Sequence, residues 1–258
     1  MRPASLPQRV RRLMKPTYFI SDLHLSPDLP RVTAGFLSLV DRLEGQAEAL
    51  YVLGDLFEAW VGDDNRSDYN LSIIEAFTRL SVRGTAVYFQ HGNRDFLMGD
   101  EFIKSCRGFL LPERQVIQCY GYQMLVEHGD ALCTRDEAYQ AFRKQSRSLP
   151  WQQVMLAKPL DERVRIAEAW RAESRMHNSN KAENIMDVTL QAVVDAMNEH
   201  QVNLMIHGHT HRPDEHVIDL GEGRQGRRMV LGDWREMDGR AVIAVADERG
   251  VELRELTF

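Results

Sequence analysis

Residues that can bind metal ions recur in this sequence at the ends of short apolar runs. Asp22 and His24 follow the run YFI in the tripeptide DLH, and His209 and His211 follow LMIHG in the tripeptide HTH. Five separate runs are each followed by such residues, which are Asp22, His24, Asp55, Asn93, His128, His209 and His211. Carboxylate oxygen, amide oxygen and imidazole nitrogen suit Mn²⁺, Fe²⁺ or Zn²⁺, and the lack of thiolate argues against a structural zinc site.

The number of candidate ligands indicates more than one metal ion. Seven ligands exceed what one ion usually takes, whereas two ions that share a carboxylate would use all of them. Such ions lie about 3.5–4 Å apart in two-metal hydrolases, where they neutralise phosphoryl oxygens and activate a bridging water as hydroxide. The sequence therefore predicts a two-metal site for the hydrolysis of a phosphoester.

Each motif alone also has a simpler structural explanation. Asp22 could cap a helix, while Asp55 and Asn93 could be turn residues next to a glycine. His128 could be a hydrogen-bonded histidine of the core or the surface. The alternate histidines of HTH are more informative, because they project to the same side of an extended segment. The five motifs together, in this order, favour the metal site.

Strands and helices alternate in the part of the sequence that must position these residues. Apolar runs at 17–21, 49–55 and 86–93 predict buried strands, and the patterns at 32–45 and 71–84 predict helices. This order predicts a parallel sheet, and side chains beyond the carboxyl ends of parallel strands converge in one crevice. Later runs predict a hairpin within 116–130, around Tyr120-Gly121, and a further strand at 203–209.

A helical segment interrupts this α/β pattern. We expect a helical insertion over about residues 135–182, within a domain that spans residues 16–258, and a separate basic arm over residues 1–15. The arm has five basic and no acidic residues, and residues 135–181 have ten basic against six acidic residues. Because the whole chain has a net charge of -6, these basic segments could face an anionic substrate or an anionic membrane surface.

Composition excludes several classes of protein. The hydrophobic and charged fractions of 43% and 27% are typical of soluble globular proteins. The chain has no apolar run of about 20 residues that could span a bilayer, and its N-terminus does not resemble a secretory signal. Its three cysteines have no CxxC spacing, which favours a reducing, cytoplasmic compartment. An aromatic content of 8% on an acidic body argues against a nucleic-acid surface.

The order D-x-H, GD, GN, H and GHxH resembles that of the calcineurin-like metallophosphoesterases over about residues 17–234. The resemblance implies an α/β fold, a four-layer α/β/β/α sandwich with a helical cap insertion. It implies one ion held by Asp22, His24, Asp55 and His211. It implies a second ion held by Asp55, Asn93, His128 and His209. The nucleophile would be a metal-bridging water held by Asp55, with Arg94 and His209 assisting.

Two positions depart from the pattern of many family members. Arg94 follows the GN pair where many members have histidine, and Glu58 stands where many have the second aspartate of GDxxD. An arginine stays protonated and cannot act as a general acid, but it binds phosphate through two parallel hydrogen bonds. This favours a substrate with a good leaving group, such as a pyrophosphate.

Longer stretches resemble one branch of this family, the UDP-2,3-diacylglucosamine pyrophosphohydrolases of lipid A biosynthesis. These are SDLHL, LGDLFEAWVGDD, HGNRDFL, HGDALCTRDEAYQAFR, NSNKAENIMDV and IHGHTHRP. The resemblance implies two Mn²⁺ ions per chain and attack of water on the α-phosphorus, which releases UMP and 2,3-diacylglucosamine 1-phosphate (lipid X). The implied substrate contacts are Asn93, Arg94, Asp136, Ser174, Asn178, Lys181 and His209.

A glycolipid nucleotide substrate has further consequences. Each buried CH₂ contributes about 0.8 kcal/mol, so the acyl chains need an apolar wall. We expect Trp151, Val154, Met155 and Leu156 to contribute to that wall or to a membrane-facing rim. We also expect a peripheral location on the cytoplasmic face of the inner membrane, with no nucleic acid and no obligate protein partner.

The same scaffold also supports other functions. The nearest alternative is another two-metal phosphodiesterase or a nucleotide pyrophosphatase. A soluble nucleotide would not need the helical insertion with its apolar stretch. A non-catalytic interaction module is the alternative from a different class, and the presence of all seven candidate ligands argues against it.

Overall fold

The computed structural model describes residues 15–180 and 187–258, with side chains omitted for residues 174–180. The basic arm expected over residues 1–15 therefore lies outside the described residues except for Lys15. Lys181 also lies outside them, and the side chains of Ser174 and Asn178 are not described.

The first sheet has six strands in the order β11-β10-β1-β2-β3-β4. Its strands are β1 (Thr17–Ile20), β2 (Ala49–Leu53), β3 (Ala86–Gln90), β4 (Phe109–Leu110), β10 (Arg240–Asp247) and β11 (Gly250–Thr257). Strands β1 to β4 are parallel, and β10 joins them antiparallel to β1. The parallel arrangement predicted from the alternating pattern is confirmed.

Three helices cover the outer face of this sheet, namely α1 (Pro30–Leu43), α2 (Asp68–Val82) and α3 (Asp100–Ser105). Helix α1 buries a face that includes Val32, Phe36 and Leu39, which recur with the helical period. Helix α2 begins before the predicted residue 71 because the Ser67 side chain accepts a hydrogen bond from Asn70 N and caps it.

The second sheet has five strands in the order β5-β6-β7-β9-β8. They are β5 (Arg114–Cys119), β6 (Tyr122–Glu127), β7 (Leu204–His207), β8 (Asp214–Gly221) and β9 (Arg224–Val230). The predicted hairpin is confirmed: β5 and β6 are joined by Tyr120 and Gly121, which both have positive φ. Such a two-residue loop matches the right-handed twist of paired strands.

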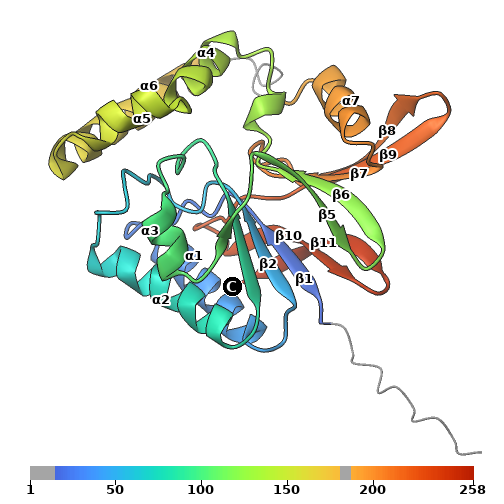
Figure 1. Ribbon diagram of the computed structural model, residues 1–258, viewed down its shortest axis with the longest axis horizontal. Helices are drawn as coiled ribbons and strands as arrows, with labels where there is room; N and C mark the ends of the chain where they lie inside the picture. Colours follow the sequence, from blue (N-terminus) through green and yellow to red (C-terminus); the bar gives the residue numbers. More distant parts are fainter. Residues whose placement is uncertain (1–14, 181–186) are drawn as a thin grey trace, which may run out of the picture.

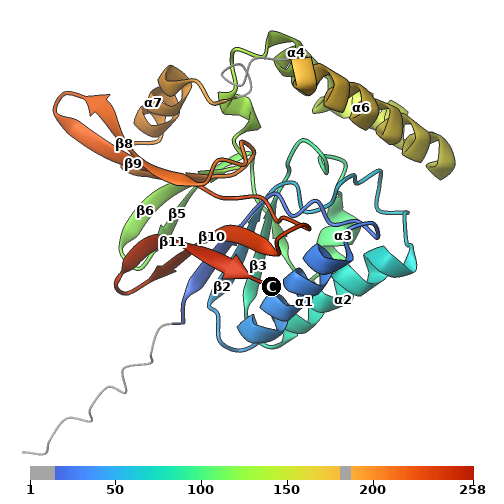
Figure 2. The same ribbon diagram turned by 180° about the vertical axis from the view of Figure 1, so that it is seen from behind.

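The two sheets pack face to face, with Phe19, Leu53, Val126, Ile206 and Met229 buried between them. Helix α7 (Leu190–Glu199) covers the outer face of the second sheet. Figures 1 and 2 show the resulting order of helices, sheet, sheet and helix. The α/β/β/α sandwich is thus confirmed, and we call it the body.

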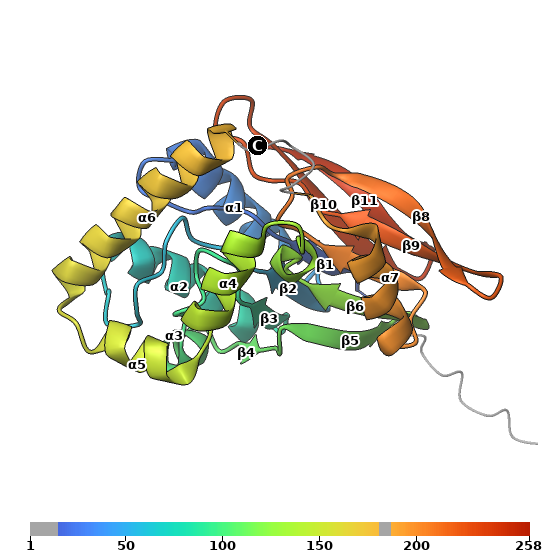
Figure 3. The ribbon, with the colours of Figure 1, turned by 90° about the horizontal axis from the view of Figure 1, so that it is seen from above.

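Helices α4 (Glu137–Ser146), α5 (Leu149–Leu156) and α6 (Leu160–Asn180) lie outside these layers. We call them the cap. Figures 1 and 3 show the cap beside the loops that follow the strands of the body. Phe142, Trp151 and Trp170 pack together within the cap, and Phe96 of the body joins their cluster. In the described part of the chain, no helix has the length and apolarity needed to cross a membrane.

Candidate metal centre

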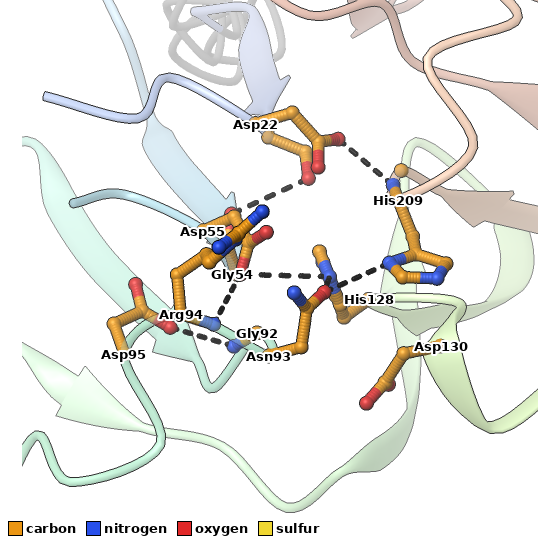
Figure 4. Close-up of polar contacts among 12 residues, drawn as sticks. Asp22, Gly54, Asp55, Gly92, Asn93, Arg94, Asp95, His128, Asp130 and His209 are labelled. Carbon is orange, nitrogen blue, oxygen red and sulfur yellow. Dashed lines mark hydrogen bonds and ion pairs between the residues drawn. The ribbon is translucent and has the colours of Figure 1, made fainter. Parts of the chain in front are cut away.

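The seven predicted ligands come together where loops follow strands of both sheets. Asp22 and His24 follow β1, Asp55 follows β2 and Asn93 follows β3, while β6 precedes His128 and β7 precedes the last two histidines. Figure 4 shows side chains from both sheets turned toward one another. The pairing of the sheet continues into these loops, since Asp22 N donates to Gly54 O and His24 N donates to Asp55 O.

The backbone at the site adopts a conformation that side chains rarely tolerate. Five of the seven ligands have φ between 50° and 69°: Asp22, His24, Asp55, His209 and His211. A residue other than glycine in this left-handed region costs about 1–3 kcal/mol and persists only where the surrounding structure enforces it. The clustering of this strain on predicted ligands supports their functional role.

The glycines of the GD, GN and GH motifs allow the loops to approach closely. A Cβ on Gly54 would lie 2.7 Å from His128 Nδ1. A Cβ on Gly92 would lie 2.1 Å from Asp55 Oδ1, and one on Gly208 would lie 2.3 Å from Asp22 Oδ2. Each glycine is therefore required by the ligand that packs against it.

One group of ligand atoms is formed by Asp22, His24 and His211, all within 4.8 Å of one another. His211 Nε2 lies 3.4 Å from Asp22 Oδ1 and 3.3 Å from His24 Nε2. Asp55 Oδ2 lies 3.9 Å from His24 Nε2, at the edge of this group. Two imidazole nitrogens and two carboxylates thus face one small volume, which is a donor set suited to a divalent cation.

A second group is formed by Asp22, Asp55 and His128. His128 Nε2 lies 3.7 Å from Asp55 Oδ1. Asn93 Oδ1 lies 3.0 Å from His128 Nε2 and 2.9 Å from His209 Nδ1. His128 Nδ1 lies 2.9 Å from Leu53 O. Because a carbonyl only accepts, the proton resides on Nδ1, and Nε2 is left available to a cation.

Buried carboxylates provide a test of whether these residues fit metal ions. Asp22 Oδ1 is buried and has no hydrogen-bond partner among the described residues. Burial raises the pKa of Asp55. Burial also opposes the charge on Asp22, but the surrounding histidines, His211 first, hold the pKa of that carboxyl well below its usual range. Two adjacent buried carboxylates need cations to offset the cost of their burial, so the residues fit divalent metals.

Acidic residues outside the predicted set contact the ligand histidines. Glu58 Oε2 lies 3.2 Å from His24 Nδ1, and Glu58 Oε1 lies 3.4 Å from Arg171 Nε of α6. Asp233 Oδ2 lies 3.8 Å from His211 Nδ1. Carboxylates in such positions orient ligand imidazoles and raise their basicity. Asp233 was not predicted from the sequence. It lies in VLGDW, which has the same apolar run and Gly-Asp pair as VLGDL at residues 52–56.

Asp95 was not predicted from the sequence either. Its side chain joins the loop after β2 to the loop after β3. Its side chain is fully buried, with Oδ1 accepting from Gly92 N at 2.7 Å and Oδ2 accepting from Leu56 N at 2.8 Å. Arg94 N donates to Asp55 Oδ1 at 2.8 Å. The sequence signal is the aspartate of GNRD, two residues after Asn93.

A cavity of about 970 Å³ extends from this centre toward the cap. Its polar end includes His24, Asp55, Asn93, Arg94 and His209. Its apolar end includes Trp60, Phe96, Phe142, Met155 and Trp170. The cavity thus combines a cation-binding end with an aromatic and aliphatic end.

Other predicted substrate-contact and wall residues differ in their relation to the cavity. Asp136 lines it and also accepts a hydrogen bond from Tyr139 N at the start of α4. Met155 lines it, and Trp151 packs against Trp170. Val154 and Leu156 are instead exposed to solvent, by 66% and 43%. The expectation of a rim still applies to both, although Leu156 also lies close to Gly62 of the body.

Comparison with known proteins shows the family. Residues 15–213 match the calcineurin-like phosphoesterase family. A protein of Serratia proteamaculans named UDP-2,3-diacylglucosamine hydrolase is 47% identical over 242 residues, 94% of this chain and 99% of that protein. Proteins with the same name are 47% identical in Escherichia coli O7:K1 and 45% identical in Chromohalobacter salexigens, each over 94% of this chain and at least 98% of the relative.

Among solved structures the likeness is weaker. An archaeal phosphodiesterase aligns with 94% of this chain and 99% of its own, at 13% identity and a TM-score of 0.49. The sequence relationship extends over nearly the full length of the chain, and the range matched to the family contains all seven residues of the centre. The chain belongs to the calcineurin-like phosphoesterases and, within them, to the family of the UDP-2,3-diacylglucosamine hydrolases.

Proposed function

We propose that this chain hydrolyses the pyrophosphate bond of UDP-2,3-diacylglucosamine in lipid A biosynthesis. Water attacks the α-phosphorus, and the products are UMP and 2,3-diacylglucosamine 1-phosphate. The relatives of that name, which are similar over nearly the whole chain, carry the proposal. The cavity supports it, because one end suits a diphosphate and the other suits acyl chains.

Two Mn²⁺ ions are the proposed cofactors. Asp22, His24, Asp55 and His211 would hold one ion. Asp55, Asn93, His128 and His209 would hold the other. When bound, the ions supply an activated water and neutralise charge on the phosphoryl oxygens. Burial lowers the pKa of His209 to about 3. Its imidazole is therefore neutral near pH 7, which is the form that binds a cation.

Arg94 would bind the diphosphate. It lines the polar end of the cavity, and its Nε is buried without a hydrogen-bond partner among the described residues. A phosphate oxygen would satisfy that donor, with the geometry that guanidinium favours. The leaving group is a sugar phosphate, which departs without a proton, so the absence of a general acid at this position is compatible with the reaction. Asp136, Ser174, Asn178 and Lys181 would contact the rest of the substrate head group.

The cap would bring the protein to its lipid substrate. Helix α5 exposes Leu149, Val154 and Leu156, and Lys144 is exposed on the neighbouring α4. Apolar side chains with basic neighbours bind shallowly to anionic membranes. We therefore place the chain as a peripheral protein on the cytoplasmic face of the inner membrane.

The direct test is hydrolysis of UDP-2,3-diacylglucosamine by metal-stripped protein with and without Mn²⁺, in water labelled with ¹⁸O. We expect Mn²⁺-dependent release of UMP that carries the label. Label in lipid X alone would contradict attack on the α-phosphorus. Absence of release from folded, metal-loaded protein would contradict the substrate, and other nucleotide pyrophosphates would then be assayed.

A further inference from the structure

The first helix of the cap is fastened to the body through one buried carboxylate. Asp130 is 1% exposed and lies in the short 3₁₀ turn after β6. Its Oδ2 accepts from Tyr139 Oη at 2.6 Å, from Arg143 Nε at 2.9 Å and from Arg147 Nη2 at 3.3 Å. All three donors belong to α4 or to the residue that ends it. Three donors on one buried carboxylate make a firm attachment.

Three members of this group, Asp130, Tyr139 and Arg147, also lie against or close in the chain to a predicted ligand. Asp130 is two residues beyond His128. Arg147 Nη2 donates to Gly92 O at 2.9 Å, and Gly92 precedes Asn93. The ring of Tyr139 stacks on the imidazole of His209, with 6.2 Å between centroids and 25° between planes. Through these contacts, α4 is connected to the chain at or near Asn93, His128 and His209. These are the three residues that would bind only the second ion.

The ligands of the other ion have different neighbours. His24 contacts Glu58, which pairs with Arg171 of α6, and His211 faces Asp233 of the body. The outer partners of the ligand side chains therefore come from different elements in the two halves of the centre. A disturbance of α4 should be felt in one half and not in the other.

We propose that Asp130, Tyr139 and Arg147 are positioning residues that couple the seating of α4 to cation binding by Asn93, His128 and His209. The inference rests on the two-ion centre proposed above. Coupling between two sites is reciprocal. A correctly seated α4 raises the affinity of that half for its cation, and the bound cation in turn holds α4 against the body.

Titration of metal-stripped, full-length protein with Mn²⁺ tests the coupling, with free Mn²⁺ measured by electron paramagnetic resonance. Asp130→Asn should weaken one of the two binding steps by about tenfold, the low end of what outer partners of metal ligands contribute, and leave the other unchanged. Tyr139→Phe retains the ring and should weaken the same step less. Arg165→Ala is the matched control and should change neither step, because the only partner of this cap arginine among the described residues is Asp161 of α6.

Hydrogen exchange of the α4 amides gives an independent measurement. Mn²⁺ should increase their protection in the parent protein, and Asp130→Asn should abolish the increase. The coupling is overturned if Asp130→Asn weakens both steps equally, or weakens neither and only raises KM, or if Mn²⁺ leaves the exchange of α4 unchanged. If the parent protein binds a single ion, the proposed two-ion centre is wrong. The coupling then stands only if Asp130→Asn lowers the affinity for that one ion.

Discussion

The body and the cap contribute to the same cavity through different kinds of structure. In the body, ligands follow strands directly, and the loops that carry them are hydrogen-bonded to one another. The cap instead contacts the body through side chains of its helices. Some are apolar, such as Met155, Phe142 and Trp151, which pack against the core of the body. Others are long and polar, namely Arg163, Arg171, Arg143 and Arg147. The comparison indicates that the body builds the cation-binding geometry, while the cap contributes Phe142, Met155 and Trp170 to the apolar lining of the cavity.

The largest effect should follow from a change in the body. Asp55→Ala removes the carboxylate shared by both proposed ions, so hydrolysis should fall by more than about 100-fold, beyond what loss of an outer partner costs. Steady-state kinetics with Mn²⁺ in excess measure this. Asp41→Ala, at an exposed ion pair on α1, is the control and should leave the rate unchanged. Appreciable activity in Asp55→Ala would place the chemistry elsewhere.

Glu58→Gln tests the contact between the body and the cap at the metal centre. The change keeps the shape of the side chain but weakens its contacts with His24 and Arg171. Mn²⁺ affinity should fall by about 10- to 100-fold, in the binding step that Asp130→Asn leaves intact. The measurement is the same Mn²⁺ titration. Weakening of the same step by both variants would show that the two halves of the centre are not supported separately.

Arg163→Met should affect the seating of the cap and leave the centre intact. Arg163 is 3% exposed, donates to Val61 O and pairs with Asp64. Its loss leaves that carbonyl unsatisfied, which costs about 1–3 kcal/mol of stability. Mn²⁺ affinity should be unchanged while KM rises. Thermal unfolding, Mn²⁺ titration and kinetics together check this, and a large loss of Mn²⁺ affinity would contradict the division between body and cap.

The ion pair between Arg163 and Asp64 predicts that stability depends on pH. The hydrogen bond from Arg163 lowers the pKa of Asp64. A lowered carboxyl pKa stabilises the fold above the ordinary value for aspartate, and this contribution is lost as the pH falls through the lowered value. The stability difference between the parent and Arg163→Met should therefore shrink in acid. Denaturant unfolding across that range measures it, and a difference independent of pH would show that the ion pair contributes nothing.

The smallest effect concerns the outer surface of the cap. Val154→Ser with Leu156→Ser should weaken binding to anionic vesicles by on the order of tenfold, since each apolar side chain contributes about 1.5–3 kcal/mol when fully buried and these would insert only in part. Val217→Ser is the matched control, because Val217 is exposed by 68% on β8, whereas Val154 is exposed by 66%. Equal losses from both changes would contradict docking through the cap.

Much of the body could be predicted from the sequence because its signals are local. Buried strands such as Ala86–Gln90 are continuous apolar runs, and α1 repeats its apolar residues with the helical period. The ligand residues were found because parallel strands deliver their following residues to one edge. The second sheet could not be predicted from local signals. Its strand order places β7 between β6 and β9, and only the family resemblance indicated a second sheet.

Contacts between the cap and the body could not be predicted in this way. Asp130 and Tyr139 are close in the chain, but Arg147 and Gly92 are separated by 55 residues, and Arg163 and Asp64 by 99. Long polar side chains carry no periodic signal, and many partners could satisfy each of them. Their pairing is decided by how the helices pack as rigid units, which spacing alone does not specify.

The left-handed backbone of the five ligand residues has a consequence for the descent of this chain. Selection for activity maintains aspartate and histidine at these positions, where glycine would remove the backbone strain. A duplicated copy released from that selection would be more stable with glycine at such positions, so inactivation and stabilisation could come in one step. Glycine or asparagine in place of His24 or His211 would then mark a relative that has kept the architecture and given up the reaction.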